Sequence, residues 1–223
     1  KEWKAEHNMD FSLYGTPLES TTYKFAKCLQ KRFGMIPGIK MITIDPQKVM
    51  QHRIADALGL DKYSVIMDIA HASDVSENDA FQHTYNGFYG VRRNEAWRKQ
   101  YYSLFEEAKK NNYDFERILT ELYCRTGNVE ASFSSKMVAT IDPNKPIWDK
   151  YVVENLGLKV PGTYDSDRLE KTVALYHKIE AWYEEYLQTP EAENCIRYWD
   201  EMLPDYTWLT DVKKIDYYLW SIR

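Results

Sequence analysis

The chain is poor in cysteine and has no long apolar run. Only three cysteines occur in 223 residues, and Cys28, Cys124 and Cys195 lie far apart. An odd number of isolated cysteines is typical of free thiols in a reducing compartment, and their spacing forms no metal site. No apolar run approaches the roughly 18 residues of a membrane span, and no charged-then-apolar leader opens the sequence. We therefore expect a cytoplasmic protein with no membrane partner, no metal and no other cofactor.

An excess of positive charge is also missing. The formal net charge is −5, which argues against a protein that coats nucleic acid, because non-specific binding depends on lysine and arginine neutralising phosphates. A local basic groove remains compatible with this balance. Four basic residues lie close together between positions 92 and 99, and Lys109 and Lys110 follow at the end of the same helical pattern. Such a run is either a solvated helix face or a small nucleic-acid contact.

Aromatic side chains are abundant. The chain has 18 Tyr, 8 Phe and 7 Trp, more than a core of this size needs. Two interpretations stay open at this point: the rings pack helices against one another, or some of them line a ligand or base-stacking surface.

Composition and periodicity predict one compact all-α unit over residues 1–223. Hydrophobic residues make up 44% and charged residues 28%, which excludes disordered and fibrous classes. Proline and glycine divide the chain into helical segments without a long linker or an internal repeat. A short strand at 41–44 is the one exception that we expect, and 87–90 reads as a turn. Helices are predicted at 21–33, from Asp45-Pro46 through Ala57, and at 94–110, 114–123, 129–141, 150–156, 165–187, 191–203 and 210–222.

Residues 53–68 resemble the helix-turn-helix of bacterial transcription regulators. Ala55 would let two helices approach, and Gly59 would make the turn between them. The second helix would present Asp61, Lys62 and Tyr63 to DNA. These side chains suit base edges poorly, because acids are repelled by phosphates and arginine, asparagine and glutamine are scarce. A regulator would need Lys62 and Tyr63 to be exposed.

The segment 114–158 carries the most specific pattern in the chain. A helix leads to a tight turn at Gly127, where glycine adopts positive φ at little steric cost, and a second helix follows. Backbone N–H groups of such a hairpin can bind a phosphate. The loop at 142–146 is stiff, since a proline at each end disfavours helix in the preceding residue. Asp149 then stands where the N-cap of the next helix belongs, and Gly157 suits its left-handed end.

Residues 87–158 resemble the helix-hairpin-helix DNA glycosylase superfamily. Its members follow the hairpin with a loop rich in glycine and proline and an essential aspartate, and Gly127 and Asp149 match this order at a separation of 22 positions, 149 − 127. The sequence Pro-Ile-Trp-Asp at 146–149, followed by Leu-Gly-Leu at 156–158, is similar to the aspartate segment of the family. The resemblance covers roughly a third of the chain and implies an all-α glycosylase fold.

The chain departs from this family in three ways. Val129 replaces the second glycine of the hairpin, and its branched side chain resists the conformations that glycine allows. Ala131 stands where lyase-competent members keep a catalytic lysine, and Lys136 lies more than one helical turn further on. The cysteine cluster of iron–sulfur members is missing as well.

The resemblance therefore implies a monofunctional glycosylase that hydrolyses the N-glycosidic bond of a damaged base in DNA. Asp149 would stabilise the positive charge on the sugar and help to activate water. Trp148, Phe88 and Tyr89 would stack on the flipped base. The residues expected to contact the nucleic acid are Gly127, Asn128, Lys136, Lys145 and Lys150.

Three alternatives stay open beside this function. The chain could be a catalytically silent member of the same fold that binds nucleic acid or a protein partner. It could be a helix-turn-helix regulator. Asp149 could also act only as a helix cap, which contributes about 1 kcal/mol.

Overall fold

The computed structural model describes residues 38–40, 42–51 and 59–222 of the chain. These residues form ten α-helices and one short 3-10 helix, with no strand among them, so the predicted all-α class is confirmed. None of the described helices is long and apolar enough to cross a membrane. In chain order the helices are α3 (Pro46–Met50), α5 (Leu60–Ala72), α6 (Asp79–Tyr89), α7 (Glu95–Asn111), α8 (Phe115–Thr126), α9 (Ala131–Ile141), α10 (Lys150–Asn155), α11 (Arg168–Tyr186), α12 (Pro190–Met202), η2 (Pro204–Tyr206) and α13 (Asp211–Ser221).

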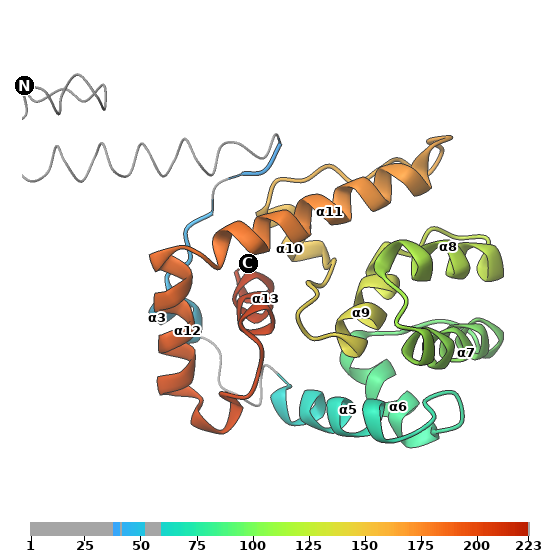
Figure 1. Cartoon of the computed structure of the whole chain (residues 1–223). Helices are drawn as coiled ribbons and strands as arrows, with labels where there is room; N and C mark the ends of the chain where they lie inside the picture. Colours follow the sequence, from blue (N-terminus) through green and yellow to red (C-terminus); the bar gives the residue numbers. More distant parts are fainter. Residues whose placement is uncertain (1–37, 41, 52–58, 223) are drawn as a thin grey trace, which may run out of the picture.

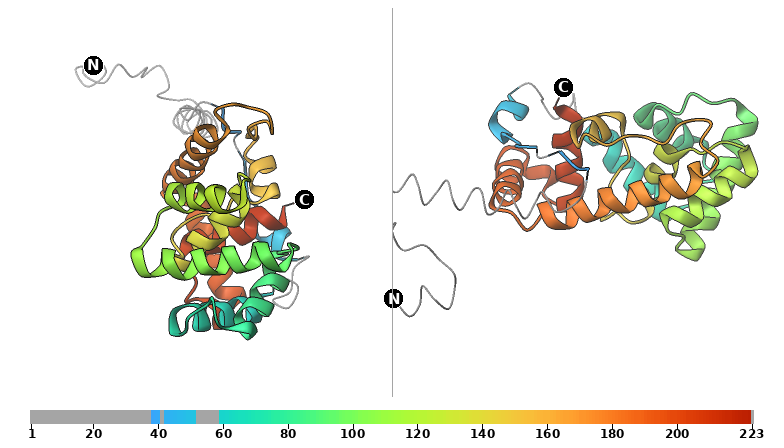
Figure 2. Two further views of the ribbon diagram at one scale, coloured as in Figure 1. Left: turned by 90° about the vertical axis from the view of Figure 1, so that its right-hand side faces the viewer. Right: turned by 90° about the horizontal axis from the view of Figure 1, so that it is seen from above.

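The helices form two groups that are joined by α11. In one group α5 packs on α6 and α9, α7 packs on α8, and α8 packs on α9. In the other group α13 packs on α12, α10 and α3. The long helix α11 runs across both groups and contacts α8 (Figure 1). The view from above in Figure 2 shows the same division, with α3 and α12 on one side of α13 and helices α5 to α9 on the other.

Short polar side chains start the helices where the sequence predicts them. The side chain of Asp114 accepts a hydrogen bond from the N–H of Arg117 at 2.8 Å, and Thr210 accepts one from Lys213 at 3.2 Å. Asp149 caps α10 by accepting from Tyr151 N at 2.8 Å. Each cap satisfies one of the N–H groups that a helix start leaves without a partner. The predicted starts of α8, α10 and α13 are therefore confirmed.

Most of the aromatic side chains in the described part of the chain are buried in the core or pack against it. Phe81, Tyr85, Tyr101, Tyr102 and Phe105 are fully buried between α6 and α7, with ring centroids 5.4–6.2 Å apart. Their hydroxyls are bonded as well, since those of Tyr85 and Tyr101 lie 3.0 Å from each other. A buried tyrosine needs such a partner because an unpaired hydroxyl in a core is destabilising.

Three local predictions were wrong. Residues 87–89 are not a turn but the last turn of α6, which begins at the Asn78 cap and ends at Gly90 in the left-handed conformation. Residues 42–44 form no strand, because the N–H of Ile44 donates to the Glu191 side chain at 2.7 Å and not to a neighbouring strand. Helix α11 starts at Arg168 and not at 165 or 166. Asp165 instead accepts from Gly162 N at 3.1 Å within its own loop.

Four of the predicted segments fall wholly or partly outside the described residues. They are the expected helix at 21–33, residue 41 of the expected strand, residues 52–57 of the helix expected after Pro46, and the first part, 53–58, of the helix-turn-helix-like segment. The described part of that segment begins at Gly59, whose φ is +68°, and continues as α5. The prediction of a single unit over the whole chain stays a prediction.

Candidate functional site

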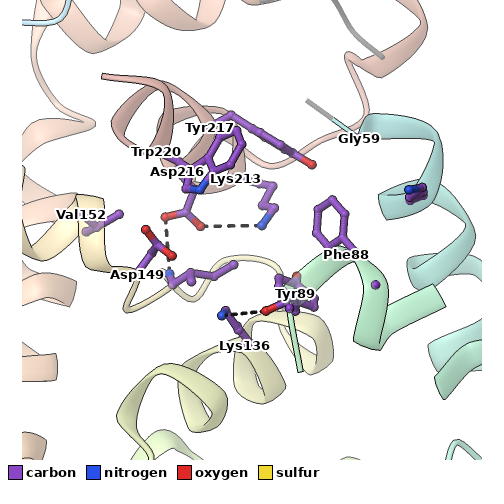
Figure 3. A pocket seen from close by; sticks show the side chains of 14 residues that line it. Gly59, Phe88, Tyr89, Lys136, Asp149, Val152, Lys213, Asp216, Tyr217 and Trp220 are labelled. Carbon is purple, nitrogen blue, oxygen red and sulfur yellow. Dashed lines mark hydrogen bonds and ion pairs between the residues drawn. The ribbon is translucent and has the colours of Figure 1, made fainter. Parts of the chain in front are cut away.

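A pocket of about 430 Å³ lies where the two helix groups meet. It is bounded by α13, the end of α6, the side of α9, the loop before α10 and the start of α5 (Figure 3). The residues that line it are Gly59, Lys62, Gly87, Phe88, Tyr89, Gly90, Lys136, Ile147, Asp149, Val152, Lys213, Asp216, Tyr217 and Trp220. Aromatic rings and charged side chains thus share one concave surface.

Helix α13 supplies one whole face of the pocket. Lys213, Asp216, Tyr217 and Trp220 are spaced by three, one and three positions, which places them along one side of a helix. The start of α13 is held in place by Thr210, whose hydroxyl caps the helix and donates to the carbonyl of Pro143 at 2.6 Å. The pocket face is therefore tied to the proline-bounded loop before α10.

Lys213 is the most unusual residue of the pocket. It is only 4% exposed, and its ammonium lies 4.6 Å from the ring centroid of Tyr63 and 5.3 Å from that of Tyr217. Such contacts stabilise a cation, but less than hydration does. Burial lowers the pKa of Lys213 from 10.5 to about 8, helped by the nearby charge of Lys136 and opposed by Asp216 and Asp149. A larger share of this amine is uncharged near neutral pH than for an exposed lysine.

Asp216 is the counterpart of Lys213 on the same helix. Its Oδ2 lies 4.0 Å from Lys213 Nζ, and its Oδ1 accepts hydrogen bonds from the Tyr183 hydroxyl and, at 3.4 Å, from Ile147 N. Burial raises the pKa of Asp216 from 3.8 to about 6, although Lys213 and both hydrogen bonds oppose this shift. Burial therefore moves the two pKa values toward each other, as expected when the charged form of each group is poorly solvated.

Lys136 and Asp149 face the pocket from the opposite wall (Figure 3). Lys136 Nζ donates to the carbonyl of Tyr89 at 3.2 Å and lies 5.7 Å from the Tyr89 ring centroid. Burial lowers the pKa of Lys136, and the charge of Asp149 opposes that shift. Asp149 is half-buried, so one carboxylate both caps α10 and lines the pocket.

Hydrogen bonds attach the loop before α10 to the core, and these bonds hold Asp149 in position. The carbonyl of Pro146 accepts from the buried Tyr176 hydroxyl at 2.8 Å. Trp148 N donates to Ser135 Oγ at 2.8 Å, and the Trp148 side chain is only 5% exposed. Trp148 is therefore part of the core and is absent from the pocket lining.

Several buried polar atoms around Lys213 have no hydrogen-bond partner among the described residues. They are the hydroxyl oxygens of Tyr63 and Tyr217 and the Oδ2 atom of Asp216. A buried polar group without a partner is destabilising by about 1–3 kcal/mol, so such groups in a native protein call for an explanation. Two of the three belong to residues that line the pocket. For Tyr217 and Asp216, a polar ligand in the pocket would supply the missing partner.

Four of the predicted site residues meet in this pocket: Phe88, Tyr89, Lys136 and Asp149. The two glycine-turn residues lie elsewhere. Gly127 ends α8 with φ +72°, and its N–H donates to the carbonyl of Tyr123 at 2.8 Å. The N–H of Asn128 points to the Thr126 hydroxyl at 3.4 Å. Neither N–H group is thus left open for a phosphate.

The two remaining lysines are also outside the pocket. Lys145 forms an ion pair with Glu180 at 3.0 Å, and Lys150 is an exposed residue that lies 3.7 Å from Glu154. The nucleic-acid contacts predicted for these residues stay predictions, as does DNA as a partner. Among the described residues there is also no cluster of three or more His, Cys, Asp or Glu side chains that could hold a metal ion.

None of the α13 residues that line the pocket was predicted from the sequence to belong to a site. Residues 210–222 were predicted as a helix whose apolar residues face the core, and Lys213 and Asp216 look like an ordinary pair three positions apart on a solvated surface. The available signal was the row of Tyr217 and Trp220 on that same side. Tyr217 is buried against Tyr63 of α5, which is more than 100 positions away in the chain.

Part of the chain matches one known protein family. Residues 1–78 match the anaerobic ribonucleoside-triphosphate reductase family. The match covers roughly a third of the chain and includes Gly59 and Lys62 at the edge of the pocket. No curated protein and no solved structure matches the chain.

The match contradicts the predicted glycosylase assignment, its DNA-repair function and both of its alternatives. The family named by the match reduces nucleotides, and no glycosylase is among the matches. The hairpin pattern has a simpler physical origin, since Gly127 ends one helix and α9 begins at Ala131. The regulator alternative fails on its own requirement as well. Tyr63 is 1% exposed and stacks on Trp208 with ring centroids 6.1 Å apart, so it cannot reach DNA.

Proposed function

We propose that the pocket binds a small organic anion that carries a flat ring. One observation carries this proposal: the ammonium of Lys213 is enclosed by tyrosine rings, and its carboxylate partner is 4.0 Å away. A cation taken out of water needs closer compensation than that. An anionic ligand next to Lys213 would provide it.

Lys136 supports the same ligand charge. Its positive charge is close enough to lower the pKa of Lys213, so the two ammonium groups repel each other across the pocket. An anion that interacts with both would convert this repulsion into attraction, and hydrogen bonds between charged groups are the stronger kind. Asp149 and Asp216 offset part of the positive charge and can accept hydrogen bonds from the polar groups of a ligand.

The aromatic lining supports a flat ring as the other part of the ligand. Phe88, Tyr89, Tyr217 and Trp220 all border the pocket, and aromatic rings favour stacked or edge-on contacts with other rings. The volume of about 430 Å³ falls in the range of roughly 300–1,000 Å³ that small-molecule sites occupy. A nucleotide is one ligand of this class. The family match, whose name refers to ribonucleoside triphosphates, supports including nucleotides among the first compounds tested.

Calorimetric titration tests the proposal with two sets of probes: the four ribonucleoside triphosphates and simple aromatic carboxylates such as 4-methylbenzoate. Replacing Lys136 by Met should weaken binding roughly 10- to 100-fold, as expected for the loss of one charge-assisted hydrogen bond of about 1.5–3 kcal/mol. Lys150→Met is the matched control, because Lys150 also lies over a tyrosine ring but is exposed and outside the pocket. Equal loss in both variants, or no binding of any probe, would reject the proposal.

The cytoplasm is the compartment that we propose for this protein. Cys124 and Cys195 are both free thiols, and free thiols persist where the surroundings are reducing.

A further inference from the structure

We infer that Lys213 forms an imine with an aldehyde carried by the ring of the bound anion. This inference rests on the proposed function, because the anion and the ring position the aldehyde. It narrows the ligand class to aromatic aldehydes with an acidic group. The two lysines would then have different roles: Lys136 would bind the anion, and Lys213 would supply the reacting nitrogen.

The position of Lys213 favours it as a nucleophile over the other lysines of the pocket. Lys62 is exposed, and the nitrogen of Lys136 is already engaged with the Tyr89 carbonyl at 3.2 Å. The nitrogen of Lys213, by contrast, has tyrosine rings beside it and forms no hydrogen bond with the described residues, and its ion-pair partner Asp216 is 4.0 Å away. An amine in such surroundings holds its proton weakly, and its pKa of about 8 agrees with this.

The surroundings also favour the product. An imine is formed with loss of water, and a pocket that buries its reacting groups limits the return of water. Lys213 is 4% exposed and Asp216 is 6% exposed, so both reacting groups are shielded before any ligand enters.

The step balances without an oxidant or a reductant. The lone pair of the uncharged Nζ attacks the carbonyl carbon, and the carbonyl π electrons move to the oxygen. The nitrogen, now positively charged, loses one of its two hydrogens as a proton and the oxygen takes up that proton, which gives a carbinolamine. The nitrogen then loses its remaining hydrogen as a second proton, the C=N bond forms, and the hydroxyl leaves as water with that second proton. One amine and one aldehyde thus give one imine and one water.

Asp216 is placed to move these protons. Its Oδ2 lies 4.0 Å from Lys213 Nζ and has no hydrogen-bond partner among the described residues. It can accept the proton that the nitrogen releases and return it to the departing hydroxyl. The other oxygen is held by the Tyr183 hydroxyl, which keeps the carboxylate in place while Oδ2 stays available.

Reductive trapping tests this inference on the full chain. The protein is mixed with 4-formylbenzoate and then with sodium borohydride, which converts an imine into a stable secondary amine. Mass spectrometry of the intact chain and of its peptides should find one adduct per molecule, located at Lys213. In Lys213→Arg, which keeps the positive charge, and in Lys213→Met, that adduct should be lost, whereas Lys150→Met should be labelled like the unmodified protein.

The same experiment separates failure of the inference from failure of the proposed function. Binding of 4-methylbenzoate, which has the ring and the anion but no aldehyde, is measured alongside by calorimetry. If 4-methylbenzoate binds but Lys213 is not labelled, the imine is rejected and the proposed function stands. If neither 4-methylbenzoate nor any of the four ribonucleoside triphosphates binds and labelling is spread over exposed lysines, both are rejected. Selective labelling at Lys213 that 4-methylbenzoate suppresses supports both.

Discussion

At the scale of single residues, the Lys213–Asp216 pair is the feature that most needs testing. Both side chains are buried, yet their charged atoms are 4.0 Å apart and do not form a hydrogen bond with each other. A pair of this kind contributes little to stability by itself, because desolvation offsets the attraction. A well-packed apolar pair in the same place would avoid this cost of desolvation.

We expect Asp216→Ala to lower the free energy of unfolding by about 3–5 kcal/mol, because it leaves a buried ammonium and the Tyr183 hydroxyl without their partner. Urea unfolding monitored by circular dichroism measures this. The double variant Lys213→Met, Asp216→Asn keeps an acceptor for Tyr183 and removes both charges, so it should recover most of the loss. A double variant as unstable as the single one would mean that the charges are not the cause.

Asp149 gives a second prediction at this scale, because its carboxylate both caps α10 and faces the pocket. Asp149→Ala should lower stability by about 1 kcal/mol through loss of the cap. Asp149→Asn should lower it by much less, since asparagine caps equally well. Thermal unfolding of the two variants distinguishes these values. If Asn were as destabilising as Ala, the charge of Asp149 toward Lys136 would matter more than its cap.

At the scale of elements, most helices were predicted correctly because the residues that start and end a helix lie within a few positions of its ends. The predicted helices 94–110 and 129–141 correspond to Glu95–Asn111 and Ala131–Ile141. Caps and glycine ends act over a few residues, so they can be read without knowledge of the fold. The turn predicted at 87–90 was wrong because glycine does not always end a helix. Gly87 lies inside α6, where glycine is tolerated, and the true end is Gly90 at φ +67°.

This difference between glycines is testable on two helices. A Cβ added at either Gly87 or Gly127 would meet nothing within 4 Å, so sterics with neighbours play no part. Gly87→Ala should stabilise the protein by roughly 0.5–1 kcal/mol, because alanine loses less backbone entropy in a helix. Gly127→Ala should destabilise it by roughly 1–2 kcal/mol, because φ +72° strains an L-residue. Differential scanning calorimetry of both variants checks the signs, and equal signs would contradict this account.

At the scale of the whole molecule, the pocket depends on helices that are far apart in the chain. Lys213 and Asp216 come from α13, and the rings around them come from α5 and α6. The titratable groups around Lys213 are Tyr63 on α5, Tyr89 on α6, Lys136 on α9 and Asp149 at the start of α10, besides Asp216 and Tyr217 on its own helix. Folding therefore sets the pKa values of the site, which links its chemistry to overall stability.

Stability should pass through a minimum between about pH 6 and pH 8. The pKa of Asp216 is raised from 3.8 to about 6, so its favourable contribution is complete below pH 3.8 and is lost as the pH rises to about 6. The pKa of Lys213 is lowered from 10.5 to about 8, so its contribution is complete above pH 10.5 and is lost as the pH falls to about 8. Between the two values both groups are charged in a poorly solvated site.

Urea unfolding from pH 4 to pH 10 measures this profile. Other groups titrate over the same range, so the informative quantity is the difference between the unmodified protein and the Lys213→Met, Asp216→Asn double variant. That difference should be least favourable to the unmodified protein near pH 7. A flat difference would show that burial perturbs neither group in the folded state.

The sequence by itself determined the helical class, the caps and glycine ends of most helices, and four of the residues that line the pocket. It did so because helix formation and capping are set by neighbours a few positions away. The family predicted from the sequence was wrong. A glycine turn, a proline-bounded loop and a capping aspartate reflect how one helix ends and the next begins, so this order of residues is not specific to glycosylases. Only the tertiary structure decided that Lys213 and Asp216 are buried beside Tyr63 and Tyr89. Burial of a charged pair requires distant helices to exclude water together, and no local pattern encodes that.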